Sequence, residues 1–352
     1  MYKDKSTLII ANWIFIGVAM LIIQTLLGGI TRLTGSGLSI TEWKPIMGTL
    51  PPLNEMQWQQ SFAEYKKIAQ FKYINNNFTL SNFKFIFFWE WFHRLWARFI
   101  SIVFIIPFFY FIVKKYIKKW MIMPLLILFC LGALQGVIGW IMVKSGLNDE
   151  NLYVSHIRLA IHFIAAMILI SYALVFGLKL KIDHSQKIIS KELSFFTICI
   201  IILLALQLMY GAFMAGLKGA AVAPTWPDIN GRLMPINFFS NGFSNAFFFN
   251  IINIHFIHRT LAYIILILIF FWWLKAKRIS TSATFNMYKN WPLIFVVIQV
   301  VLGIIAIVSS TKIVRGNFGQ FEWIAQMHQL FGMLLLLSFV ANFYLISPKS
   351  SK

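Results

Sequence analysis

The sequence is poor in charged residues and in cysteine. Only 12% of its 352 residues are charged, and just 11 of them are acidic. Its two cysteines, Cys130 and Cys199, stand in apolar segments and form neither a C-x-x-C pair nor the C-x-x-C-H motif of covalent haem attachment. These absences exclude a soluble domain of average composition, a disulfide-bonded scaffold and a covalently attached cofactor. We interpret both cysteines as packing residues.

Apolar residues dominate instead, at 59% of the chain, with 36 phenylalanines and a mean hydropathy of +0.75. No segment alternates as the strands of a membrane β-barrel do. Eight apolar runs approach or exceed the roughly 20 residues that cross a bilayer: 11–30, 86–113, 121–143, 157–178, 193–215, 250–274, 291–311 and 323–346. We therefore predict an all-α, polytopic membrane protein with eight transmembrane helices.

The basic residues give a net charge of +20, and they fall in alternate connections between these runs. By the positive-inside rule both termini are cytoplasmic, and the two long connections, 31–85 and 216–249, lie outside. This distribution favours lipid and excludes nucleic acid as the partner. The first run carries no small-residue cleavage site, so we expect a retained anchor in a bacterial inner (cytoplasmic) membrane.

The chain contains an internal repeat. Three pairs of segments align at offsets of 165, 164 and 166 residues: 90–94 with 255–259, 135–139 with 299–303, and His162 with His328. The repeat predicts two tandem four-helix bundles, 1–183 and 184–352. An even number of crossings gives both halves one orientation, so a pseudo-twofold axis along the membrane normal is expected.

Each odd-numbered helix carries a Gln-x-x-x-Gly motif, which begins at Gln24, Gln135, Gln207 and Gln299. A glycine in a membrane helix allows close approach, and a glutamine one turn away can hydrogen-bond across the contact. Two interpretations stay open: helix packing alone, or room for the face of a porphyrin.

Each even-numbered helix carries one histidine at an equivalent place: His93, His162, His258 and His328. All four lie about 24 to 30 Å from the inner surface at 1.5 Å per residue. Two imidazoles on opposite sides of a plane are what six-coordinate haem iron needs. We predict one haem for the pair in each half. Zinc or copper is the weaker alternative, because no cysteine or second carboxylate joins the cluster.

Three further histidines are interpreted separately. His184 lies in a basic inner loop and is expected to be solvated. For His156, near the outer end of its helix, we expect a surface role in preference to contact with a haem edge. His255 competes with His258 as a ligand, but the repeat favours His258, because both it and His93 precede an arginine.

The halves differ one turn before the predicted ligand, where Glu90 aligns with His255. A carboxylate beside a haem can relay protons or stabilise a cationic intermediate. The alternative is an ion pair with Arg94 or Arg98 on the same helix. Four arginines near the outer boundary are candidates for haem propionates, with lipid phosphates as the equal alternative: Arg94, Arg98, Arg158 and Arg259.

Several motifs spread over both halves belong together: Gly28-Gly29-Ile30-Thr31-Arg32-Leu33-Thr34, Ser36-Gly37-Leu38-Ser39-Ile40-Thr41-Glu42-Trp43-Lys44-Pro45, Pro51-Pro52-Leu53, Glu90-Trp91-Phe92-His93-Arg94, Arg158-Leu159-Ala160-Ile161-His162, Thr225-Trp226-Pro227, His258-Arg259 and His328-Gln329. In these motifs the chain resembles the haem A synthase family, membrane enzymes that convert haem O to haem A for terminal oxidases. The outer-loop run and the Glu-Trp-x-His-Arg element are the specific parts.

The resemblance implies that the first half holds the substrate haem O between His93 and His162, with Glu90 bearing on catalysis. It implies a haem b between His258 and His328 that passes electrons. The reaction would be successive hydroxylations of a ring methyl, with loss of water leaving a formyl group in haem A. It further implies, as partners, the farnesyltransferase that produces haem O, terminal oxidase assembly and an electron donor of unknown identity. A homo-oligomer is left open.

Two departures and two alternatives accompany the resemblance. The first outer loop lacks the cysteine pair of some members, and the flanks of the Thr-Trp-Pro motif differ, which leaves the roles of Asp228 and Asn230 open. A dihaem electron carrier would need the four histidines but not Glu90. A transporter would need broken helices at mid-membrane and no haem.

Overall fold

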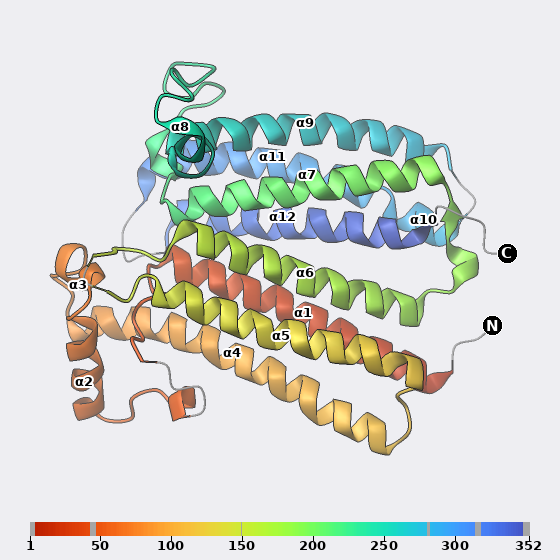
Figure 1. The fold of residues 1–352 in the computed structure, drawn as a ribbon, viewed down its shortest axis with the longest axis horizontal. Coiled ribbons are helices and arrows are strands. Elements are labelled where there is room, and N and C mark those ends of the chain that lie inside the picture. Colours follow the sequence, from red (N-terminus) through yellow and green to blue (C-terminus); the bar gives the residue numbers. More distant parts are fainter. Residues whose placement is uncertain (1–3, 43–46, 149, 280–281, 314–317, 348–352) are drawn as a thin grey trace.

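The computed structural model describes residues 4–42, 47–148, 150–279, 282–313 and 318–347 (Figure 1). Trp43, Lys44 and Pro45 of the outer-loop motif lie outside these ranges. Eight helical segments in the described ranges are long and apolar enough to cross a membrane: α1 (Lys5–Leu33), α4 (Leu80–Val113), α5 (Lys119–Lys144), α6 (His156–Lys181), α7 (Lys191–Gly216), α9 (Ile251–Lys277), α10 with α11 (Ala283–Tyr288, Trp291–Ser309) and α12 (Gln320–Leu345). The prediction of an all-helical chain with eight spans is confirmed.

Short elements lie at both ends of this bundle. The first long connection holds η1 (Met47–Thr49), α2 (Glu55–Tyr65) and α3 (Ala69–Tyr73), and the second holds η3 (Ala220–Val222), α8 (Gly242–Ser244) and η4 (Asn245–Phe249). η5 (Ser310–Lys312) follows α11 and contacts η3 at this same end. At the opposite end are η2 (His184–Gln186) and a parallel pair of two-residue strands, β1 (Ile188–Ile189) and β2 (Ile346–Ser347). Figure 1 shows α2, α3 and α8 at one end and both termini at the other.

Polar caps fix where the helices begin. Thr79 forms a capping box at the start of α4, so that helix begins at Leu80, ahead of the apolar run expected from residue 86. Ser155 accepts a hydrogen bond from the first turn of α6, and Asn250 does the same for α9. These caps set the register of the helices, and with it the depth of the histidines that follow.

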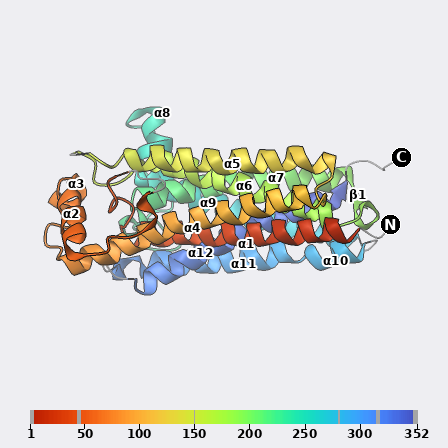
Figure 2. The ribbon, with the colours of Figure 1, turned by 90° about the horizontal axis from the view of Figure 1, so that it is seen from below.

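The same helix neighbours recur in the two halves. In the first half α1 packs against α4 and α6, and α5 packs against α6. In the second half α7 packs against α9 and α12, and α11 packs against α12. The halves meet where α6 contacts α7 and α12, and where α1 contacts α12 (Figure 2). α1, α6, α7 and α12 therefore form the centre of the molecule.

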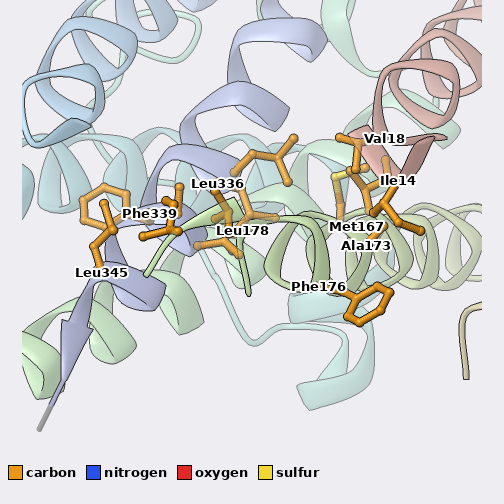
Figure 3. Close-up of a cluster of buried hydrophobic side chains, with 14 of the residues drawn as sticks. Ile14, Val18, Met167, Ala173, Phe176, Leu178, Leu336, Phe339 and Leu345 are labelled. Carbon is orange, nitrogen blue, oxygen red and sulfur yellow. The ribbon is translucent and has the colours of Figure 1, made fainter. Parts of the chain in front are cut away.

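The largest apolar cluster lies in the part of the bundle nearer the termini. Figure 3 shows side chains of α1, α6 and α12 within it, including Ile14, Met167 and Phe339. Trp272 of α9 is fully buried there, and its Nε1 atom donates to the Thr197 hydroxyl at 2.8 Å. Because lipid tails are as apolar as these side chains, close packing and buried hydrogen bonds stabilise the cluster.

Candidate functional site

Four histidines occupy one level of the bundle, on α4, α6, α9 and α12: His93, His162, His258 and His328. Each stands 17 to 20 residues before the last residue of its helix, a distance of about 26 to 30 Å. The helices run through this level without a break, and α10 and α11 are separated only near the end of the bundle that carries the termini. The described spans therefore do not have the broken helices that the transporter alternative requires.

Every one of these imidazoles lies against a glycine of a neighbouring helix. A Cβ atom added at the glycine would approach the Cε1 atom of the ring at 3.2 Å for Gly28 and His93, 2.9 Å for Gly139 and His162, 3.2 Å for Gly211 and His258, and 3.0 Å for Gly303 and His328. Only a residue without a side chain allows the ring to lie on the helix backbone in this way. The room that the sequence suggested for a porphyrin face is taken by the histidine ring itself.

The glutamine of each motif bonds to the same histidine. The Nε2 atom of Gln24 lies 3.2 Å from the Nε2 atom of His93. Corresponding contacts of 3.4 and 3.3 Å join Gln207 to His258 and Gln299 to His328, while Gln135 donates to the carbonyl oxygen of His162 at 2.9 Å. The Gln-x-x-x-Gly motif is therefore a seat that orients an imidazole, repeated four times.

Among these four histidines, His328 has a tautomer that its hydrogen bonds define. The Nδ1 atom of His328 lies 3.1 Å from the carbonyl oxygen of Gln299. A carbonyl can only accept a hydrogen bond, so Nδ1 carries the proton and Nε2 keeps its lone pair. This is the arrangement usual for a metal-binding histidine, whose second nitrogen donates to a backbone carbonyl. The Nδ1 atoms of His162 and His258 are buried without a hydrogen-bond partner.

The spacing of the rings fits an iron between two imidazoles. The ring centroids of His258 and His328 are 6.4 Å apart, with planes inclined by 72°. Metal–nitrogen bonds of about 2 Å on both sides of one ion would separate two ligating rings by roughly 6 Å. In the first half His93 and His162 stand at the same level on α4 and α6. No group of three or more His, Cys, Asp or Glu that could bind a metal occurs among the described residues.

Glu90 is 3% exposed and anchors the first long connection to α4. Its carboxylate accepts hydrogen bonds from the Ser39 hydroxyl at 2.7 Å, the Ile40 amide at 2.8 Å and the Arg94 guanidinium at 2.5 Å. Arg94 donates in addition to the carbonyl oxygen of Ile40 at 3.2 Å. The ion pair expected as the alternative role of Glu90 is thus present with Arg94. It stands one turn from His93.

His255 takes the corresponding place in the second half and is fully buried. Its Nε2 atom donates to the Gly219 carbonyl at 2.8 Å, and its Nδ1 atom lies 3.3 Å from the guanidinium of Arg259. Both nitrogens are engaged, so His258 is the ligand candidate that remains on α9. Arg259 also donates to three carbonyl oxygens of the second long connection, at Ala223, Thr225 and Asp228.

Asp228 and Asn230, whose roles the sequence left open, build a turn in this connection. The Thr225 hydroxyl donates to the Asp228 carboxylate at 2.6 Å, and the Gly231 amide donates to it at 2.8 Å. The hydrogen bond from Thr225, followed by that from Gly231, lowers the pKa of Asp228 below its usual value. Asn230 has a φ of 54°, and its backbone amide donates to the Thr225 hydroxyl. The turn presents to Arg259 the carbonyls that it binds.

The expected surface role of His156 is wrong. Its side chain is buried at 9% exposure, and its Nε2 atom donates to the carbonyl oxygen of Phe248 at 2.8 Å. The ring meets Phe213 and Phe249 edge-on, and Gly216 of α7 allows it to approach. It therefore joins the two halves. His184 is exposed, as the sequence predicted.

Two of the remaining candidate arginines differ in exposure. Arg158 is exposed and donates to the carbonyl oxygen of Ile141 at 3.1 Å, and Arg98 is half-buried. Sequence reasoning missed a polar contact between the halves, made by Gln326 and Gln329 of α12. These donate to the carbonyls of Leu26 and Thr25, each at 3.0 Å. The Gly-Gly pair of α1 and the His-Gln pair of α12 were the available signals.

Comparison with known proteins identifies the family. Residues 11–340 match the COX15-CtaA family, described as cytochrome oxidase assembly protein. The chain is similar to the haem A synthase of Flavobacterium johnsoniae, at 38% identity over 329 residues, 91% of this chain and 94% of the relative. It is 38% identical to that of Flavobacterium psychrophilum, over 96% of both chains, and 36% identical to that of Novosphingobium aromaticivorans, over 98% of this chain and 97% of the relative. With a family match over nearly its whole length and relatives this similar from end to end, the chain belongs to the haem A synthase (COX15-CtaA) family.

Proposed function

We propose that this protein converts haem O to haem A in the membrane, oxidising a ring methyl to a formyl group by successive hydroxylations. The observation that carries the proposal is the two histidines in each half, all four at one level, with every ring against a glycine and every histidine bonded to a glutamine. Such seats fix ring orientation before a ligand arrives, which lowers the cost of binding one.

The two sites have different roles in this proposal. The substrate haem O is bound between His93 and His162, and a haem b between His258 and His328. The difference between Glu90 and His255 supports the division, because only the first half has a carboxylate one turn from its ligand. The recurring helix neighbours support two repeated halves, 1–183 and 184–352, about a pseudo-twofold axis along the membrane normal.

The residues present fit such groups and would act in distinct ways. A haem bound here supplies the redox chemistry. The histidines would hold its iron through Nε2. In His328 this is the atom that the Gln299 amide faces at 3.3 Å, so that amide would give way to the iron while the hydrogen bond from Nδ1 to the Gln299 carbonyl keeps the ring oriented. Glu90 can accept a proton at a carboxylate oxygen, while Arg94 stabilises its charged form and keeps the pair neutral overall. The first outer connection, held by this pair, excludes water from the outer side of the site.

The surroundings follow from the same proposal. The termini face the cytoplasm of a bacterium, and the long connections face the outside of the inner membrane. Propionates are bound by arginines at the outer boundary: Arg94, Arg98, Arg158 and Arg259. The partners are the enzyme that farnesylates haem, the machinery of terminal oxidase assembly, and an electron donor.

The test is haem extraction and spectroscopy of the purified membrane protein, followed by turnover of haem O. We expect haem b with haem O or haem A in the native protein. Glu90→Gln should retain the haem b spectrum and lose formation of haem A. Full turnover in that variant would contradict the catalytic role of Glu90. A wild-type protein that binds haem but forms no haem A would favour a dihaem electron carrier. A protein that binds no haem would contradict the proposal as a whole.

A further inference from the structure

The two halves differ in one helix contact. In the second half α9 packs against α11 and closes that side of the bundle. In the first half α4 and α5, which are both described throughout, make no comparable contact (Figure 2). The repeat is therefore broken on the side of the first half that faces lipid.

Small residues stand where the two helices fail to meet. At the offset of the repeat, Gly132 and Gly136 of α5 take the places of Val296 and Val300 in α11. A Cβ atom added at either glycine would meet nothing within 4 Å, whereas Val296 is only 2% exposed.

The facing surface of α4 is equally bare. Ala97 and Ser101 are both exposed, and the repeat places Ala262 and Leu266 at the corresponding positions of α9. Neither Ala262 nor Leu266 is exposed. The first half thus has less side-chain volume on both walls.

This bare strip, formed by Ala97, Ser101, Gly132 and Gly136, continues from the histidine pair. Gly136 and Gly132 lie one and two turns from Gly139, the glycine against which His162 rests. Ala97 and Ser101 lie one and two turns beyond His93 on α4. The strip runs from the proposed iron site toward the end of the bundle that holds the termini.

Side chains close the strip at both ends. Toward the outer connections, Phe83 and Phe87 of α4 pack in a cluster with Val143 of α5. Toward the termini, Phe111 of α4 belongs to the same buried cluster as Leu125 of α5. Between these clusters lies a lateral window, in which the four small residues of the strip cover just over one helical turn of each helix, or roughly 6 Å.

The chemistry of the window selects its occupant. Its walls are apolar apart from the Ser101 hydroxyl, which donates to its own helix at 3.1 Å. Beside its outer end, the Oε1 atom of Gln135 and the Nδ1 atom of His162 are buried without partners, as expected where a ligand belongs. An occupant must be slender and apolar, and attached to a group bound between His93 and His162.

We propose that the window between α4 and α5 receives the isoprenoid chain of haem O while its ring lies between His93 and His162. This inference rests on the proposed function. Haem b has no such chain, and in the second half Val296, Val300 and Leu266 fill the equivalent space. The window therefore determines which half binds the substrate.

The experiment fills the window and compares haem O with haem B. Gly132→Val with Gly136→Val restores the residues of the second half. Ala133→Val is the matched control, because it makes the equivalent change to Val297 on the exposed face of α5. Ala97→Leu with Ser101→Leu fills the opposite wall. Each variant, carrying haem b in its second half, is titrated in nanodiscs with each haem and followed by absorbance.

We expect both filled variants to lose about tenfold or more in affinity for haem O and to keep their affinity for haem B, with the control unchanged. An unchanged haem O affinity, or equal losses for both haems, would overturn the window. An unaltered haem b spectrum reports that each variant is folded. His93→Ala separates the two proposals: if the wild-type protein and this variant take up haem O alike, the proposed substrate site fails whatever the window does.

Discussion

The close contact between His328 and Gly303 predicts a loss of haem b that grows with the size of the residue substituted for Gly303. A Cβ atom at Gly303 would lie 3.0 Å from the Cε1 atom of the ring, closer than ordinary van der Waals contact. Alanine therefore requires the ring to move by a few tenths of an ångström. Valine adds two methyl groups to the same space, and overpacking of this kind costs about 1 to 3 kcal/mol. Displacement of the ring also breaks its hydrogen bond to the Gln299 carbonyl.

If the cost falls on the ligated state, haem b affinity should fall by roughly 5- to 150-fold in Gly303→Val and less in Gly303→Ala. The absorbance spectrum should change from that of six-coordinate toward five-coordinate iron, because one imidazole is displaced. Gly17→Ala is the control, since a Cβ atom there meets nothing within 4 Å. Normal haem b content and spectrum in Gly303→Val would refute the reasoning that His328 is a ligand held on this glycine.

Three further predictions concern the polar contacts that hold the two long connections. Glu90→Ala removes the carboxylate that pairs with Arg94, so the attachment of the first long connection to α4 should weaken by about 3 to 5 kcal/mol. Proteolysis of this connection should become faster, and an unchanged cleavage rate would contradict its attachment through Glu90. His255→Ala should keep haem b but expose the second connection to protease, whereas His258→Ala should lose haem b, and the reverse pattern would exchange their roles. The pKa of Asp228 in the folded chain lies below the ordinary 3.8, so its carboxylate stabilises the turn fully above that pH, and this stabilisation is lost as the pH falls through the lowered value. Proteolysis of the turn should therefore rise below about pH 4. The Asp228→Asn variant should lose this pH dependence.

Much of the fold could be predicted from the sequence because the bilayer imposes it. The eight apolar runs and the capped starts of the helices are local features, and they suffice to bring the histidines to one level. The even number of spans also explains why both long connections lie opposite the termini.

What the sequence could not supply were contacts between helices. The glycine of each Gln-x-x-x-Gly motif receives an imidazole, which depends on how far one helix lies from the next. His156 reads as a residue at a helix end, yet it is buried because η4 and α7 cover it. Glu90 bonds to an outer connection about 50 residues earlier in the chain, a pairing that helical spacing does not indicate.

The polar contacts between the halves explain how two separate sites can act together. Gln329 directly follows His328 and donates to the carbonyl oxygen of Thr25, and Thr25 directly follows Gln24, whose amide contacts the ring of His93. His328 is thus connected to His93 through the side chains of Gln329 and Gln24, with the interhelical hydrogen bond from Gln329 to the Thr25 carbonyl between them. In the proposed function electrons pass between the sites, which requires a fixed separation, and a hydrogen bond to the backbone at the level of the rings would provide it. The hydrogen bonds between α1 and α12 fix the side of the first half that faces the second half. In our proposal the opposite side, between α4 and α5, is therefore free to admit the substrate.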